Sequence, residues 1–309
     1  MKSQKRPFQK GIINHCYQRS KDGGLIFYSY SDYLVWFTIV CTVARRYNVT
    51  ILAMCPMPDH VHLSVAAFSG KDLSAFMRDC SSLYALRFNH ACKTKGPVFE
   101  ARFGSAPKYG TKNGRTNLMY VWNNPVERQL ASKAEDYRWN FLAYAESDHP
   151  FSEKLIIRKA GKAMQKAVGE VKAQFKMGLP MTHAQLKRIF NTLTNEECQQ
   201  LTDYIITTYN VIDYDTALTF FNSYDDLLKA VHSTTSKDHD INEVFIGKSD
   251  AHYLKMTSVI MRELKLNDIP DIMAMSPEEK FDAFQILRKY SDAMGEQIAK
   301  FLHMQFVKL

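Results

Sequence analysis

The segment at residues 60–66, His-Val-His-Leu-Ser-Val-Ala, most constrains the fold of this chain, because its polar and apolar residues alternate. Alternation with a period of two is typical of a half-buried β-strand. An apolar run at residues 50–54 precedes it, and a short loop at residues 55–59 separates the two. We therefore expect an antiparallel hairpin in which His60, His62 and Ser64 share one face of a sheet.

Hydrophobic periodicity places further elements around this hairpin. Extended segments are expected at residues 11–18 and 98–103, and apolar positions at helical spacing predict helices at 31–46, 72–92 and from about 115 to 125. The resulting order, β-α-β-β-α-β-α, is the split βαβ arrangement of a ferredoxin-like α+β domain. We expect an antiparallel sheet with helices on one face, which leaves the other face for ligands.

The pattern changes near residue 148, where we expect a boundary between a domain at residues 1–148 and an all-α domain at residues 149–309. Residues 275–304 resemble the first two helices of a helix-turn-helix, with too few residues after them for a third. DNA binding, packing and dimerisation are therefore alternative roles for the second domain. Its helices are expected at residues 153–176, 183–208, 214–232, 250–264 and 277–303.

Basic residues are concentrated in the N-terminal half. Residues 1–150 hold 20 Lys and Arg against 11 Asp and Glu, a net charge of +9, whereas residues 151–309 hold 20 against 21, a net charge of −1. Such an excess indicates a polyanionic partner, most commonly nucleic acid. Charge by itself is explained equally well by solubility.

The cysteines and the hydropathy pattern indicate a compartment. The six cysteines form no CxxC pair and mostly lie among apolar residues, so we expect reduced, buried thiols. The basic N-terminus lacks the apolar run of a signal peptide, and the apolar stretch at residues 33–44 is too short to span a bilayer. We expect a cytoplasmic protein with no membrane partner, associated with the nucleoid if its partner is DNA.

His60 and His62 could ligate one metal ion, because residues i and i+2 of a strand point to the same side. Taken alone, such a pair is more often two surface or hydrogen-bonded histidines. Tyr120 and Asn124 are four residues apart on the third expected helix and share one face of it, although Asn124 precedes a proline near the expected helix end. Tyr120 alone would be interpreted as a half-buried core aromatic.

Three ordered motifs carry a family resemblance. Residues 51–63 (ILAMCPMPDHVHL), 119–126 (MYVWNNPV) and 135–140 (EDYRWN) resemble the single-tyrosine HUH transposases, and among them the REP-associated tyrosine transposases. The resemblance covers roughly residues 8–145. An isolated His-x-His would be weak evidence, but three motifs in this order are specific.

The resemblance implies a transposase-like endonuclease and strand transferase that nicks single-stranded DNA at hairpin or repeat-associated sites. His60, His62 and Asn124 would bind a divalent metal, Mg²⁺ or Mn²⁺, and Tyr120 would form a 5′-phosphotyrosine and release a 3′-OH. Magnesium prefers oxygen ligands, so manganese matches the imidazoles better. A free phenol has a pKa of about 10 and needs a base or the metal to assist it, but its covalent link conserves the phosphodiester energy for rejoining.

Basic residues near the motifs are candidates for DNA contacts, and Phe99, Phe103 and Trp122 are candidates for base stacking, with a solvated face as the alternative. We interpret Tyr137 and Trp139 as an aromatic anchor of the domain edge. REP-associated relatives often carry an N-terminal Gly-Thr-aromatic motif that this chain lacks, so the sequence leaves the DNA target open. The DNA-binding candidates are Arg87, Lys93, Lys95, Arg102, Lys108, Lys112 and Arg115.

Two rival functions follow from the same residues. One is a domesticated DNA-binding or regulatory protein that has the fold without turnover, and it forms no covalent adduct with DNA. The other is a metal-dependent hydrolase with water as nucleophile, which cleaves DNA without a protein link. The sequence also leaves open whether the protein is a monomer or a homodimer, and whether Tyr120 acts on the metal of its own subunit.

Overall fold

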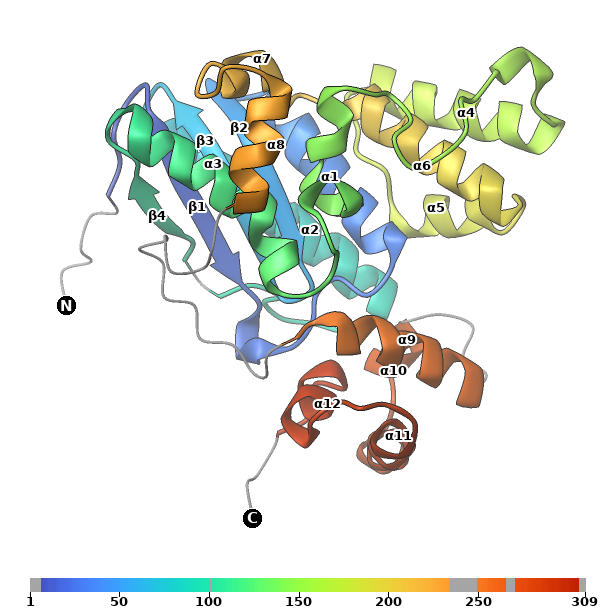
Figure 1. Cartoon of the computed structure of the whole chain (residues 1–309). Helices are drawn as coiled ribbons and strands as arrows, with labels where there is room; N and C mark the ends of the chain where they lie inside the picture. Colours follow the sequence, from blue (N-terminus) through green and yellow to red (C-terminus); the bar gives the residue numbers. More distant parts are fainter. Residues whose placement is uncertain (1–6, 101, 234–248, 265–269, 306–309) are drawn as a thin grey trace.

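A four-stranded antiparallel sheet in the order β2-β3-β1-β4 forms the centre of the computed structural model, which describes residues 7–305 except 101, 234–248 and 265–269 (Figure 1). The element order β-α-β-β-α-β-α and the α+β fold class are as predicted. The elements of the sheet region are β1 (Ile13–Arg19), α1 (Tyr30–Ala44), β2 (Val49–Met57), β3 (His60–Ala67), α2 (Gly70–Cys92), β4 (Gly104–Pro107) and α3 (Gly110–Glu127).

The hairpin of β2 and β3 is tighter than the sequence predicts. The strands pair as far as Met57 and His60, so most of the expected loop is extended strand and only Pro58 and Asp59 make the turn. The main-chain oxygen of Pro58 accepts hydrogen bonds from the loop before α1, which holds the turn against the body of the protein. The antiparallel register places His62 between β1 and β2 in the middle of the sheet.

Helices cover both faces of the sheet, and the expectation of helices on one face only is wrong. Helices α1 and α2 lie behind the sheet in Figure 1, and α3 crosses its front. The alternating pattern is real, but both sides of β3 are buried, with His62 and Ser64 fully covered. The polar side is covered because Ser64 Oγ donates a hydrogen bond to Asn117 Oδ1 of α3 at 2.8 Å.

The fourth strand lies later in the chain than predicted. Residues 98–100 make only an isolated bridge, between Phe99 and Ser20, and β4 begins at Gly104. The Phe99 ring is buried against Trp36 and Tyr84 of the helical layer, so side-chain packing rather than a ladder holds this segment. Gly104 can pair with β1 because glycine has no Cβ. A Cβ at this position would collide with the ring of Tyr17.

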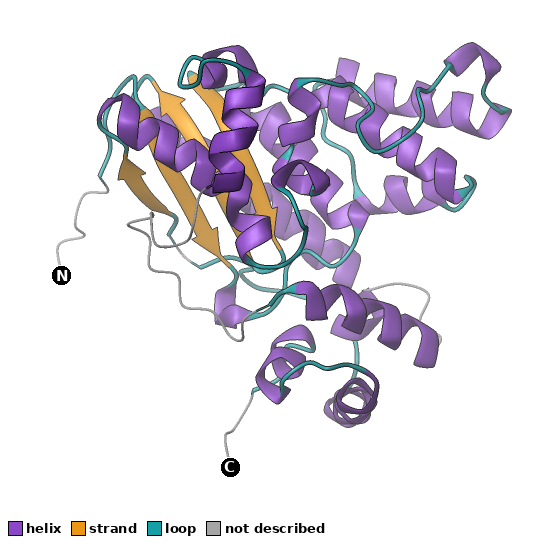
Figure 2. Cartoon of the chain, viewed as in Figure 1, coloured by secondary structure: helices purple, strands orange, loops and turns teal. Residues whose placement is uncertain are grey.

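Several of the remaining helices pack directly on elements of the sheet region. Helices α5 and α6 contact α1, and α8 contacts α3, while α9, α11 and α12 contact one another below the sheet (Figures 1 and 2). Capping boxes begin α5, α6 and α11, and the box at Thr194 divides the helix expected at residues 183–208 into α5 and α6. These helices are α4 (Lys162–Lys176), α5 (His183–Phe190), α6 (Asn195–Tyr209), α7 (Tyr214–Leu218), α8 (Tyr224–Ser233), α9 (Ala251–Glu263), α10 (Pro270–Met273), α11 (Pro277–Tyr290) and α12 (Gly295–Phe301).

Aromatic side chains fill much of the core between α1 and the segment after α3. Trp139 stacks on Tyr33 with ring centroids 4.6 Å apart, as expected of an aromatic anchor. The proposed stacking residues Phe99, Phe103 and Trp122 are also buried, so the expectation that they receive DNA bases is wrong. All six cysteines are free thiols, five of them buried. Within the described helices, none is long and apolar enough to cross a membrane.

Candidate active site

His60 and His62 lie at the start of β3 with their ring centroids 4.7 Å apart and their planes at 85°. Both are buried, and each engages its Nδ1 atom. His60 Nδ1 lies 2.5 Å from Asp59 Oδ1, and His62 Nδ1 lies 3.1 Å from the Nε2 atom of His15. Nε2 is therefore the atom that each imidazole would present to a metal ion.

His15, on β1, is a site residue that the sequence analysis missed. Its ring stacks on His62 at 5.2 Å and is fully buried. Nε2 of His62 can ligate a metal only when its proton is on Nδ1, so His15 Nε2 would accept that proton in a hydrogen bond. The alternation His15-Cys16-Tyr17 on an expected strand was the signal that could have found it.

Helix α3 brings Tyr120 to these histidines across 58 residues of sequence. The Tyr120 ring meets His62 edge-on at 5.4 Å and 80°, and meets His15 at 5.6 Å and 75°. Asn117, one turn earlier, fixes the helix to β3 through the hydrogen bond with Ser64. Three of the four predicted catalytic and metal-binding residues are thus in one cluster.

Asn124 lies one turn after Tyr120 and is 1% exposed. The helix continues through Pro125 to Glu127, so Asn124 is not at a frayed end. Its Oδ1 atom is buried and accepts no hydrogen bond from any described residue. A buried acceptor without a hydrogen bond lowers the stability of the folded protein unless a ligand binds to it. An amide oxygen can bind a hard cation.

Two buried histidines and one buried amide oxygen are the donors that the sequence predicts for a metal site. Across the described ranges, no three or more His, Cys, Asp or Glu side chains converge as a metal site. The Asn124 amide oxygen, the third ligand predicted from the sequence, lies on α3 one turn after Tyr120. Imidazole nitrogens together with an oxygen suit Mn²⁺ better than Mg²⁺.

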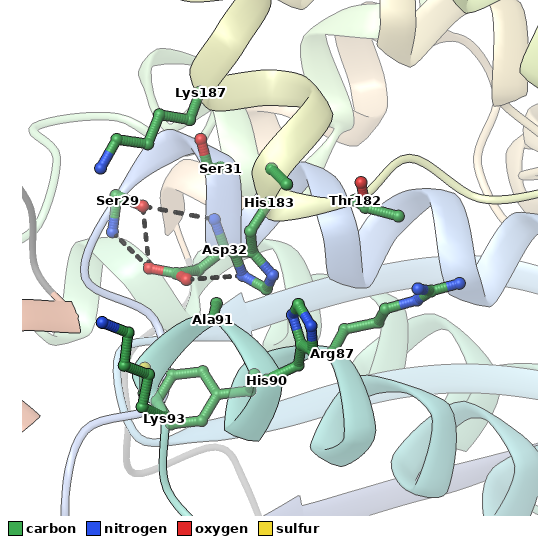
Figure 3. Close-up of a pocket in the computed structure, with 13 residues that line it drawn as sticks. Ser29, Ser31, Asp32, Arg87, His90, Ala91, Lys93, Thr182, His183 and Lys187 are labelled. Atoms are coloured by element: carbon green, nitrogen blue, oxygen red, sulfur yellow. Dashed lines mark hydrogen bonds and ion pairs between the residues drawn. The ribbon is translucent and has the colours of Figure 1, made fainter.

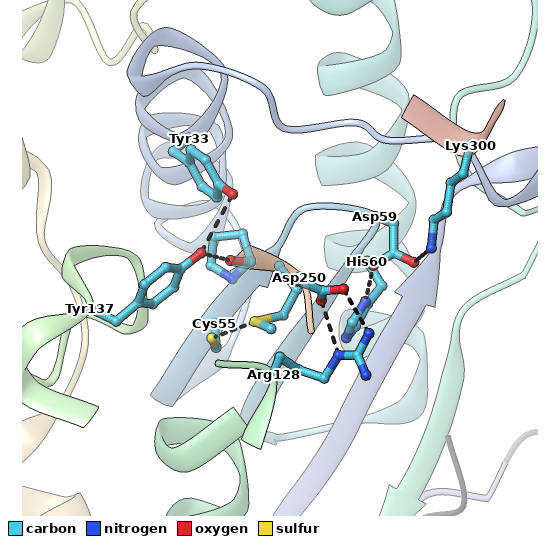
Figure 4. A network of polar contacts seen from close by, with 10 residues as sticks. Tyr33, Cys55, Asp59, His60, Arg128, Tyr137, Asp250 and Lys300 are labelled. Atoms are coloured by element: carbon cyan, nitrogen blue, oxygen red, sulfur yellow. Dashed lines mark hydrogen bonds and ion pairs between the residues drawn. The ribbon is translucent and has the colours of Figure 1, made fainter. Parts of the chain in front are cut away.

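Asp59 joins His60 to the C-terminal helices (Figure 4). Its Oδ2 atom lies 2.5 Å from Nζ of Lys300 on α12, and Lys300 is mostly buried. Burial would raise the pKa of Asp59, but the charges and hydrogen bonds of His60 and Lys300 outweigh burial and hold that pKa well below its usual range. A carboxylate that accepts from the far nitrogen of a histidine fixes the orientation of the ring.

The end of α3 is tied to the same C-terminal helices. Arg128 follows α3 and forms a two-pronged ion pair with Asp250, with Nε–Oδ2 and Nη2–Oδ1 distances of 3.0 and 2.6 Å. Both side chains are buried. Both Lys300 and Asp250 lie in helices that the sequence predicts, far from the motifs, and the sequence analysis assigned neither to the site.

The seven predicted DNA contacts do not form one surface. Arg87 and Lys93 line a cavity beside α1 and α5, whereas Arg102 lines a hollow beside α2. Lys112 and Arg115 line a third hollow between α3 and α8, where Arg115 also contacts Asp226 at 3.5 Å. Lys95 is exposed and Lys108 is half-buried, and neither lines these hollows.

Comparison with known proteins places the cluster within a transposase-like region. Residues 30–124 match the family model described as "Transposase IS200 like", and this range contains the two motif histidines, Tyr120 and Asn124. The resemblance predicted from the motifs is thereby confirmed over these residues, and the match supports a transposase or DNA-binding role.

Among solved structures, the chain is similar to a REP-associated tyrosine transposase bound to a REP hairpin. The two are 22% identical, the alignment covers 45% of this chain and 81% of that one, and the TM-score is 0.39. No curated protein matches the chain.

Proposed function

We propose that the protein is a metal-dependent enzyme that nicks and rejoins single-stranded DNA beside hairpins or repeats, with Tyr120 as nucleophile. The observation that carries the proposal is the contact of the Tyr120 ring with His62 at 5.4 Å. A strand histidine pair and a helical tyrosine, each unremarkable alone, meet at one place. The IS200-like match over the same residues supports this interpretation.

Each group of the cluster has a task in the proposed reaction. The Tyr120 phenol oxygen forms a bond to the scissile phosphorus, and the bond from phosphorus to the 3′ oxygen breaks. The phenol proton leaves to a base or to water, and the departing 3′ oxygen takes up a proton to give a 3′-OH. Reversal of the same exchange, with another 3′-OH as attacker, joins strands without an external energy source.

His60, His62 and Asn124 would hold the divalent metal. When bound, the metal supplies Lewis-acid polarisation of the phosphoryl oxygen. Asp59 and His15 orient the two rings by accepting from their Nδ1–H groups, and Lys300 holds Asp59 in place. These three are positioning residues.

Tyr120 exposes only 3% of its surface, which favours the rival protein that binds DNA without turnover. The enzyme and its rival therefore differ in one observable, which is whether a covalent protein–DNA link forms.

The test uses single-stranded hairpin oligonucleotides labelled at the 3′ end, incubated with the full chain and Mn²⁺. A 5′-phosphotyrosine retains the 3′ part of the strand, so the label should migrate with the protein on a denaturing gel. Tyr120→Phe should abolish the adduct, and EDTA should abolish it as well. Tyr109→Phe is the matched control, because Tyr109 is 61% exposed just before α3 and should leave the adduct unchanged.

Other outcomes assign the protein to its rivals. Cleavage without a labelled adduct would indicate a hydrolase that uses water. Binding without cleavage across a library of genomic hairpins would indicate the DNA-binding protein. An adduct that persists in Tyr120→Phe would contradict the assigned nucleophile.

A further inference from the structure

The two sides of the sheet differ in the aromatic surface that they offer to a DNA base. Behind the sheet, a cavity of about 500 Å³ lies between the N-terminal end of α1, the C-terminal end of α2 and the N-terminal end of α5 (Figure 3). The phenyl ring in its wall, Phe88, is 3% exposed and offers no face to a base. Within the sheet itself, Tyr17 of β1 is 39% exposed, so its ring is accessible.

Strand β1 places Tyr17 on the same side of the sheet as the candidate active site. His15 and Tyr17 are two residues apart on β1, so their side chains point to one side, and their ring centroids are 5.7 Å apart. The ring of His15 in turn contacts the rings of His62 and Tyr120. Tyr17 is also directly opposite His62 in the register of β1 and β3. It is thus the exposed end of a row of rings that begins at the buried Tyr120.

Small residues of the edge strand β4 make room for the Tyr17 ring. Gly104 is opposite Tyr17 and Ala106 is opposite His15, so β4 has no large side chain beside this row. A Cβ at Gly104 would collide with the ζ carbon and both ε carbons of the ring, which shows that the ring lies over Gly104. Helix α3 packs on β2 and β3, and Figure 1 shows β4 and the end of β1 beside it. The main chain of β4 therefore supports one face of the ring, and the other face is accessible.

We propose that Tyr17 is the base-stacking residue of the candidate site, and that a base of single-stranded DNA close to the scissile phosphate stacks on its exposed ring face. Such stacking tolerates all four bases, because every base has a π-face. The stack would hold the strand beside the metal-binding histidines without a contact to phosphate. This role rests on the proposed function in taking single-stranded DNA as the ligand, and it is one that the buried Phe99, Phe103 and Trp122 cannot fill.

The test is equilibrium binding of a fluorescent single-stranded oligonucleotide in EDTA, so that no cleavage occurs. Tyr17→Leu keeps an apolar cover over the edge glycine, which by itself stabilises a sheet, but has no ring face. We expect about tenfold weaker binding, with an unchanged slope of log K against log salt because stacking neutralises no phosphate. Tyr17→Phe keeps the ring and should bind within about twofold of the wild type. The control Tyr290→Leu makes the same change at a tyrosine of α11 that is 42% exposed, and it should bind as the wild type does.

Two further changes test the same contact from the other side. Gly104→Ala puts a Cβ where the ring lies, so it should weaken binding of the wild type but not of Tyr17→Leu. An abasic site moved along the oligonucleotide removes one base at a time. At one position it should weaken binding to the wild type about tenfold and leave binding to Tyr17→Leu unchanged. If Tyr17→Leu does not fold, the same scan with Gly104→Ala in its place measures the contact.

Binding of Tyr17→Leu as tight as that of the wild type would overturn the stacking role. So would a Tyr17→Phe variant that loses as much affinity as Tyr17→Leu, or abasic losses that are equal in the wild type and Tyr17→Leu at every position. The covalent adduct at Tyr120 is measured separately. An adduct together with no effect of Tyr17 on binding contradicts only the stacking role, whereas Tyr17-dependent binding without an adduct contradicts only the proposed enzyme.

Discussion

The sheet region, residues 1–150, and the helical region that follows it differ in net charge. Ion pairs between the two regions join them. The sheet region carries a net charge of +9 and the helical region −1. Carboxylates of the helical region nevertheless pair with arginines of the sheet region, two of these pairs being buried. The pairs are Arg115 with Asp226, Arg128 with Asp250 and Arg138 with Asp203.

The basic excess of the sheet region is therefore not all available to a polyanion. Part of it is compensated inside the protein, and the compensating groups are far away in the sequence. One ion pair has the opposite polarity. Its cation, Lys300, belongs to the helical region, and its carboxylate, Asp59, lies beside His60 in the sheet region. The nearly neutral region therefore contributes to the geometry of the candidate active site in the basic one.

The largest effect is expected from breaking the buried connection between the regions. Arg128→Met leaves Asp250 as an uncompensated buried charge, so the free energy of unfolding in urea should fall by about 3–5 kcal/mol. The double variant with Asp250→Leu should recover most of this loss, because it removes the stranded charge. Arg188→Met is the control, since Arg188 pairs with Glu170 on the surface and little change is expected. Wild-type stability of Arg128→Met would show that the pair does not join the regions.

The next effect concerns the metal site of the sheet region. His62→Gln should weaken Mn²⁺ binding, measured by electron paramagnetic resonance, by at least about a hundredfold, because loss of outer partners alone typically costs 10- to 100-fold. His149→Gln, which changes a histidine outside the cluster, should bind Mn²⁺ as the wild type does. Equal affinities of the two variants would remove His62 from the ligand set.

A smaller effect tests whether the helical region acts on the metal site. Lys300→Met should weaken Mn²⁺ binding by about tenfold, because Asp59 then holds His60 less firmly. Lys300→Arg should restore most of the affinity by retaining the charge, and Lys289→Met on the exposed side of α11 should change nothing. Lower stability of Lys300→Met with unchanged Mn²⁺ affinity would mean that Lys300 is only structural.

The smallest effect is a difference in thiol reactivity between the cysteines of the two regions. Burial raises the pKa of the Cys41 thiol to about 12, and the other cysteines of the sheet region are buried as well. The thiolate is the reactive form, so native protein at pH 8 should take up iodoacetamide slowly and only at Cys198 of the helical region. Labelling in urea should modify all six cysteines. Rapid labelling of Cys16 or Cys55 in the native state would contradict the packing of the sheet region.

Local periodicity was sufficient to predict most of the sheet region. β3 and α2 lie within about two residues of their expected positions, because their apolar residues repeat at the strand and helix periods. The fourth strand was misplaced because the apolar character of Phe99 reflects burial against helices rather than ladder pairing. The covered histidine face was missed because Asn117 and Ser64, which join α3 to β3, look like surface residues in sequence.

The residues of the candidate site also fall into two groups, those that the sequence predicts and those that only the fold brings together. His60, His62, Tyr120 and Asn124 were predicted from motifs that resemble the single-tyrosine transposases, whereas Asp59, Lys300 and Asp250 depend on contacts between residues up to 241 positions apart. No periodic pattern encodes such contacts. The basic residues were predicted as one group because they are close in sequence, but the fold distributes them over several surfaces.

The most direct test of the central claim is to locate the covalent link itself. Protein incubated with hairpin DNA and Mn²⁺ is digested with nuclease and trypsin, and the modified peptide is sequenced by mass spectrometry. We expect a nucleotide remnant on Tyr120 and on no other tyrosine. A remnant on Tyr109 or on another tyrosine, or cleaved DNA without any modified peptide, would contradict Tyr120 as the nucleophile beside His60 and His62.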